Sequence, residues 1–146
     1  MNIDALLDKT IVDICGAKRL SPEIIFTCSD GTSYKMYHFQ DCCEKVLVED
    51  VCGDVADLIG VPIVRAHETT NSLDEGIQLE SITWTFYHLV TIKGYVTIRW
   101  LGTSNGYYSE KVNFDQLTCE GENHDCTIGM KPHEYRADPK PQRREQ

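Results

Sequence analysis

Residues 81–100 read S-I-T-W-T-F-Y-H-L-V-T-I-K-G-Y-V-T-I-R-W and contain the strongest strand pattern of the chain. On both sides of Lys93-Gly94, large apolar side chains occupy every second position, which is the pattern of a strand with one buried face. Glycine tolerates the positive φ that a tight turn requires. The stretch therefore predicts two long antiparallel strands joined at Lys93-Gly94. The positions that share one face in each strand are Ile82, Trp84 and Phe86, followed by Val96, Ile98 and Trp100.

Shorter β-prone runs lie on either side of this pair. Asp30-Gly31 and Ser104-Asn105-Gly106 each separate two of them and favour tight hairpins, because Gly, Asn and Asp tolerate positive φ. Residues 67–80 lack a sustained period and are predicted to form a surface loop. The predicted short strands are residues 11–14, 23–28, 32–38, 43–51, 61–66 and 107–114.

A short helical segment is predicted at residues 54–59, with Asp54 as its N-cap and Gly60 just past its end. The whole pattern predicts a mainly β (α+β) fold. We expect a single twisted antiparallel sheet, or a small barrel, of about seven strands with one or two short helices. Residues 1–117 are predicted to form a single β-rich domain. Residues 118–146 contain three prolines and scattered charges, and are predicted to be an arm or partly disordered.

The composition describes an acidic globular chain. Its net charge is −9, and 41% of its 146 residues are hydrophobic, close to the average for folded domains. Negative charge repels phosphate groups, so direct binding of nucleic acid is disfavoured. The N-terminus lacks the basic start of a secretory signal, and no apolar stretch approaches the roughly 20 residues that span a bilayer. We therefore expect a cytoplasmic protein without a membrane partner, and we interpret its seven cysteines first as thiols.

Two blocks of unusual composition carry a resemblance to a known family. They are Y-H-F-Q-D-C-C-E at residues 37–44 and E-D-V-C-G-D-V-A-D-L-I-G at residues 49–60. With the strands described above, they make residues 9–114 similar to an uncharacterised family of small proteins found in bacteriophage and prophage genomes. In that family an acidic residue often follows the histidine, whereas this chain has Phe39. The resemblance implies a virus-associated protein in the host cytoplasm, and it implies no activity.

The first of these blocks also contains the residue types of a metal site. Zinc in proteins is usually held by four thiolate or imidazole ligands. An alternative hypothesis is therefore a metal-binding module or metal-dependent enzyme, holding zinc or another divalent cation, with Asp41 and Glu44 nearby. Alternation along a strand would send Cys42 and Cys43 to opposite faces, so we expect them to be poor disulfide partners for each other. The candidate metal ligands are His38, Cys42, Cys43 and Cys52.

Acidic side chains define the leading hypothesis. A dense acidic segment attracts basic surfaces at long range, and proteins that handle nucleic acids have such surfaces. We therefore predict an interaction protein, more readily than an enzyme, that binds a basic host protein and modulates a nucleic-acid-handling or defence complex. The alternative without a binding role is that the acidic side chains only keep the protein in solution. The candidate binding residues are Asp41, Glu44, Glu49, Asp50, Asp54 and Asp57, and no catalytic residue is predicted.

A second alternative is a protein that sequesters a small ligand such as a signalling nucleotide. Aromatic side chains stack on nucleobases, and basic side chains bind phosphate groups. Aromatic residues at alternate strand positions more often belong to a core. The candidate contacts are Trp84, Trp100, Tyr107 and Tyr108 for stacking, and Lys35 and Arg99 for phosphate.

Overall fold

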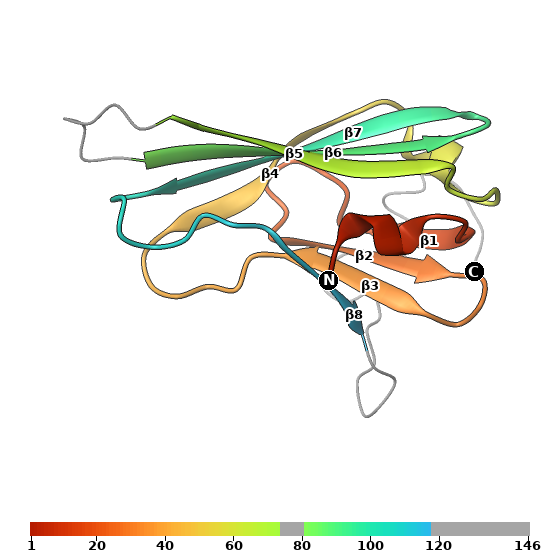
Figure 1. Ribbon diagram of the computed structural model, residues 1–146, viewed down its shortest axis with the longest axis horizontal. Helices are drawn as coiled ribbons and strands as arrows, with labels where there is room; N and C mark the ends of the chain where they lie inside the picture. The colour runs from red at the N-terminus through yellow and green to blue at the C-terminus, as the bar shows by residue number, and fades with distance from the viewer. Residues whose placement is uncertain (74–80, 118–146) are drawn as a thin grey trace.

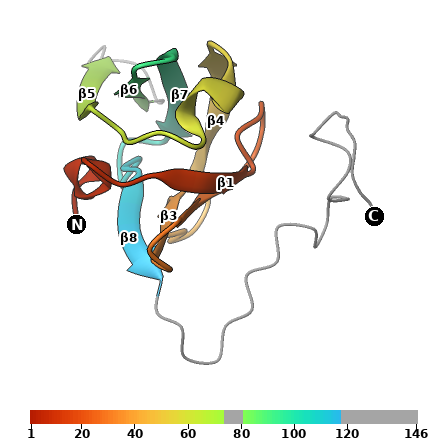
Figure 2. The ribbon, with the colours of Figure 1, turned by 90° about the vertical axis from the view of Figure 1, so that its right-hand side faces the viewer.

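The computed structural model describes residues 1–73 and 81–117, and these residues form eight strands in two four-stranded antiparallel sheets. Figures 1 and 2 show the two sheets as two layers of one β-sandwich. The first sheet has the order β1 (Ile11–Cys15), β2 (Glu23–Cys28), β3 (Ser33–Tyr37) and β8 (Asn113–Leu117). The second has the order β4 (Lys45–Cys52), β7 (Gly94–Ser104), β6 (Ser81–Thr91) and β5 (Arg65–Leu73).

The mainly β prediction is confirmed, with two sheets in place of one. Each sheet has one strongly apolar face, and two such faces leave water when they pack on each other. Within the described residues the helices are two four-residue 3-10 turns, η1 (Ile3–Leu6) and η2 (Val55–Leu58). Neither of these two turns is long and apolar enough to cross a membrane.

The core lies between the two sheets. The predicted face of Val96, Ile98 and Trp100 is buried there, but the predicted face of Ile82, Trp84 and Phe86 was wrong as a buried face, because β6 turns its other side inward. Tyr87 and Leu89 of β6 and Ile98 and Trp100 of β7 point inward and are almost fully buried. Trp100 reaches the opposite sheet, where its Nε1–H points at the sulfur of Met36 at 3.1 Å. The intervening residues of β6 therefore point away from the core, toward the outer face of the second sheet.

Two of the predicted turns and the predicted helix are confirmed. β2 and β3 pair on either side of the turn at Asp30-Gly31. β6 and β7 pair up to the turn at Lys93-Gly94, where Thr91 lies opposite Gly94. Asp54 caps η2 by accepting a hydrogen bond from the backbone N–H of Ala56 at 3.0 Å. Gly60 follows the helix with a φ of +90°, which favours glycine.

Several strand predictions were wrong. Residues 61–66 were predicted as one strand, but β5 begins only at Arg65, and Ser104-Asn105-Gly106 does not join two paired strands. Residues 67–73 belong to β5, although they were predicted as loop, because an edge strand with both faces near water needs no apolar period. Residues 107–112 form no strand, and the chain instead crosses to the first sheet, where β8 pairs with β3. The other parts of those predictions, residues 74–80 and 118–146, lie outside the described residues.

Gly102 of β7 allows the β7–β8 connection to approach the second sheet closely. A methyl group at this position would lie 2.8 Å from the Cβ of Glu110 and 3.0 Å from its carbonyl oxygen. We expect Gly102→Ala to lower the free energy of unfolding by about 1–3 kcal/mol, because the backbone must move to relieve the clash. Urea unfolding followed by circular dichroism measures this change. Thr103→Ala, on the opposite face of β7, is the matched control, and a Gly102→Ala protein no less stable than that control would contradict the packing.

Candidate functional site

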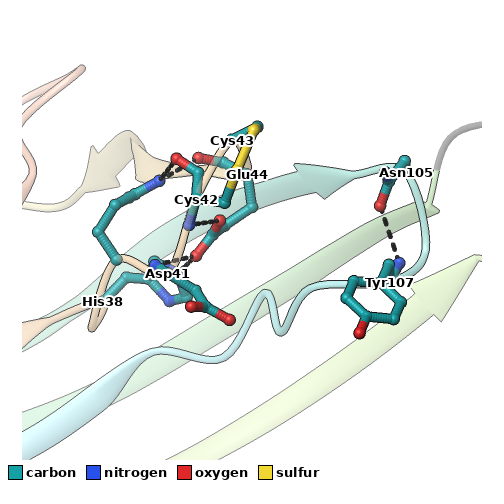
Figure 3. The surroundings of a disulfide bond; sticks show 8 residues. His38, Asp41, Cys42, Cys43, Glu44, Asn105 and Tyr107 are labelled. Atoms are coloured by element: carbon teal, nitrogen blue, oxygen red, sulfur yellow. Dashed lines mark hydrogen bonds and ion pairs between the residues drawn. A yellow bond between two sulfur atoms is a disulfide. The ribbon is translucent and has the colours of Figure 1, made fainter.

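Glu44 is the centre of the 38–44 loop, which we define as residues 38–44 between β3 and β4. Its side chain is fully buried. One carboxylate oxygen accepts hydrogen bonds from the backbone N–H of Asp41 at 2.7 Å and from Nε2 of His38 at 2.7 Å, and the other accepts from the N–H of Cys42 at 2.9 Å (Figure 3). Burial by itself would raise the pKa of Glu44, but these hydrogen bonds outweigh it and lower the pKa to about 2. The carboxylate therefore holds the loop in the ionised state.

His38 joins the 38–44 loop to the β7–β8 connection. Its Nδ1 lies 2.6 Å from the carbonyl oxygen of Lys111, and its Nε2 lies 2.7 Å from the Glu44 carboxylate. A carbonyl oxygen and an ionised carboxylate can only accept, so each ring nitrogen of His38 has an acceptor within hydrogen-bond distance. His38 and Glu44 form a buried pair, which is an ion pair when the imidazole is protonated, with only 4% of the histidine side chain exposed.

Cys42 and Cys43 are joined by a disulfide, so the prediction that they are poor partners was wrong. They lie in a bend before β4 begins at Lys45, and strand alternation does not apply there. Both residues are exposed. Because Lys45 pairs with Thr103, this bend lies next to the turn that carries Asn105 and Tyr107 (Figure 3).

The four predicted metal ligands are not assembled as a ligand set. In the disulfide, Cys42 and Cys43 offer no thiolate, and both nitrogens of His38 are engaged in hydrogen bonds. Cys52 lies at the far end of β4. Within residues 1–73 and 81–117 there is no group of three or more His, Cys, Asp or Glu residues that could hold a metal ion.

The six acids predicted as a binding surface are spread over the molecule. The eight-residue strand β4 separates Asp41 from Asp54 by roughly 25 Å. Each of the others has a separate place: Glu44 is buried, Glu49 lies 3.8 Å from Arg19, Asp50 binds Arg99, and Asp57 lies against Gly94. Asp41 is exposed. The structure therefore does not bring these carboxylates together as one compact site.

The outer face of the second sheet carries a ladder of stacked rings, which we call the aromatic face and define as Trp84, Phe86, His88, His67 and Arg99. Along β6, Trp84 and Phe86 stack at 6.2 Å between ring centroids, and Phe86 and His88 stack at 6.4 Å. His67 of β5 stacks on His88 at 4.6 Å. The three β6 rings are half-buried, so part of each is open to solvent.

Arg99 completes the aromatic face from β7, where it lies opposite Phe86. Its guanidinium lies 5.5 Å from the ring centroid of Trp84, within the range of a cation–π contact. Nε and Nη2 of Arg99 each donate to one carboxylate oxygen of Asp50. The hydrogen bond from Arg99 lowers the pKa of Asp50, so this pair stays charged and fixed in position.

Only some of the residues predicted to contact a nucleotide lie on the aromatic face. Trp84 and Arg99 lie on it, but Trp100 is buried in the core. Lys35 lies on β3 of the other sheet, 3.3 Å from Glu23. Tyr107 and Tyr108 pack edge to face in the turn after β7. No local pattern predicted His67 and His88 as site residues, because only the pairing of β5 with β6 brings them together.

The fold and these features define a two-sheet β protein with an aromatic outer face and a loop tied by the buried pair of His38 and Glu44. The chain belongs to the family described as Domain of unknown function (DUF7448), whose sequence model matches residues 4–114. The match covers the 38–44 loop and the aromatic face, and it agrees with the predicted resemblance to an uncharacterised family. Neither the curated proteins nor the solved structures contain a match to the chain.

Proposed function

We propose that the protein is an interaction protein that binds a partner protein through its aromatic face. The observation that supports this most strongly is the ladder of Trp84, Phe86 and His88 on the outer side of β6, partly open to solvent. The core is built from the opposite side of the same strand, so the fold does not require large rings here. Trp and Arg are enriched among the residues that contribute most to protein interfaces.

The aromatic face is also rigid before binding. Each β6 ring stacks on a neighbour, and Arg99 is held by two hydrogen bonds from its guanidinium to Asp50. Ordering a side chain at an interface costs roughly 0.5–1.5 kcal/mol, and side chains that are already fixed avoid most of that cost. A partner that covers the rings would therefore bury apolar surface with little further loss of side-chain conformational entropy.

The charge of the chain indicates the kind of partner. A net charge of −9 attracts a basic protein at long range and accelerates association. In this role the dispersed acids act through their summed field and need not form one contact site. The predicted resemblance to phage and prophage proteins supports a partner in the host cytoplasm, and the acidic charge supports a partner from a nucleic-acid-handling or defence complex.

Capture from host lysate tests the proposal. We expect the tagged protein to retain a host protein at low salt and to lose it as salt rises, because screening weakens charge-steered association. Trp84→Thr combined with Phe86→Thr should abolish this capture, since both rings are removed while strand-forming residues remain. Tyr107→Thr removes an exposed ring elsewhere and should capture as well as the wild type does. Equal capture by the double variant and the wild type would overturn the assignment of the aromatic face.

A nucleotide is the second candidate ligand, favoured by the contact between Arg99 and Trp84. Stacking of a base on an aromatic side chain contributes roughly 1–3 kcal/mol. Two of the guanidinium nitrogens already bind Asp50, which leaves Arg99 less free to hold a phosphate. Mass spectrometry of small molecules released by heating the purified protein distinguishes this candidate. A blank result from cells that make the relevant nucleotide would remove it.

A further inference from the structure

The disulfide between Cys42 and Cys43 is open to attack from solvent. Both cysteines are exposed, and they lie in a bend that projects before β4 begins. Thiol–disulfide exchange requires an incoming thiolate to reach one of the two sulfur atoms. Exposed disulfides are the labile and regulatory ones, in contrast to the buried disulfides of secreted proteins. This bend is separate from the aromatic face.

The backbone around the disulfide is held by contacts that do not involve sulfur. The Glu44 carboxylate accepts from the N–H groups of Asp41 and Cys42. The side-chain amide of Gln40 donates to the carbonyl oxygens of Cys42 at 3.2 Å and of Glu44 at 2.6 Å. None of these four hydrogen bonds involves a sulfur atom, so we expect the loop to stay formed and the two thiols to stay next to each other when the S–S bond opens.

We propose that Cys42 and Cys43 form a reversible two-electron thiol–disulfide site whose substrate is a dithiol. A thiolate of the dithiol attacks one sulfur, the S–S bond breaks, and the sulfur that leaves takes up a proton. The second thiol of the dithiol then attacks the mixed disulfide and releases the other cysteine as a thiol. The dithiol is oxidised to its disulfide, and the protein pair gains two electrons and two protons.

The reduced pair also has the chemistry of a binding site for trivalent arsenicals. An arsenic(III) oxide condenses with two neighbouring thiols, so two As–S bonds form and the oxygen leaves as water. A single thiol cannot close such a ring.

The test uses the full chain with dithiothreitol as the dithiol and phenylarsine oxide as the probe. After reduction and removal of the dithiol, we expect near-stoichiometric phenylarsine on the peptide that contains residues 42 and 43, by peptide mapping and mass spectrometry. Without reduction that peptide should carry none. Far-UV circular dichroism should show the β fold throughout.

Three variants separate a site from incidental thiols. Cys42→Ser and Cys43→Ser each leave one thiol in the bend and should give no bridged adduct on that peptide. Cys52→Ser removes another exposed cysteine and should leave the adduct unchanged. The proposal would be overturned if the disulfide opened only when the fold was lost, or if the single-serine variants bound phenylarsine at residues 42 and 43 as the wild type does.

Discussion

Replacement of Trp100 by alanine is expected to lower the free energy of unfolding by about 3–5 kcal/mol. Trp100 is fully buried between the sheets, and its indole N–H points at the sulfur of Met36 in the opposite layer. Removal of the ring leaves a large cavity at the point where the two sheets meet. Urea unfolding followed by circular dichroism measures the loss. If the domain does not fold at all, Trp100→Phe, which retains a ring, gives a smaller loss in the same direction.

Trp84→Ala is the matched control for Trp100→Ala. Trp84 lies on the outer face, where it stacks on Phe86 and contacts Arg99. Loss of an aromatic stacking contact or of a cation–π contact costs roughly 0.5–1 kcal/mol each, so we expect a total of about 1–2 kcal/mol. A one-residue slip in the register of β6 and β7 would exchange the inner and outer faces. An equal or larger loss for Trp84→Ala would therefore contradict the assignment of the faces.

Glu44→Gln is expected to destabilise the protein by several degrees in melting temperature, although the two side chains have the same shape. Both carboxylate oxygens accept backbone N–H groups, from Asp41 and from Cys42. An amide has only one acceptor oxygen, so its NH₂ group would face a backbone donor, and His38 would lose its charged partner. Glu49→Gln in the following strand is the control. It should change stability by less than about 0.5 kcal/mol, because Glu49 only approaches Arg19 at the surface.

The carboxyl group of Glu44 also determines part of the stability of the protein at low pH. Its pKa is about 2 in the folded protein and 4.5 in an ordinary glutamate, so the folded state binds the proton less readily than the unfolded state. Glu44 therefore contributes its full stabilisation above pH 4.5, and this contribution is lost as the pH falls toward 2. Urea unfolding at a series of pH values should show this loss in the wild type and in Glu49→Gln. A Glu44→Gln protein with the same acid-dependent loss would contradict the role of the carboxylate.

Strand alternation correctly predicted the two strands of the long hairpin, but in β6 it marked the outer face, where Trp84 and Phe86 lie, in place of the inner face of Tyr87 and Leu89. The spacing of Val96, Ile98 and Trp100 correctly placed them on one face, because apolar burial imposes a period of two. The existence of two sheets could not be predicted in this way, since local periodicity does not say which apolar faces meet. β5 was missed for a related reason: its residues 67–72 are exposed, and no apolar period marks them.

The candidate sites depended on contacts that a local pattern does not contain. The stretch from His38 to Glu44 was singled out by its composition, but its interpretation assumed strand geometry through Cys42 and Cys43, whereas the chain bends there. The pair of His38 with Glu44 also involves the carbonyl of Lys111, which is distant in the sequence. The predicted acidic binding surface failed to appear as one site because several of its carboxylates bind groups of the fold itself, as Asp50 binds Arg99.

Acrylamide quenching of tryptophan fluorescence tests most directly the central claim, that β6 builds the core with one face and offers the other to a partner. The chain has two tryptophans, so Trp100→Phe leaves only Trp84 and Trp84→Phe leaves only Trp100. We predict strong quenching of Trp84 in the free protein, reduced quenching of Trp84 in the complex with the captured partner, and weak quenching of Trp100 in both. Equal protection of the two tryptophans in the free protein, or unchanged quenching of Trp84 in the complex, would contradict the account.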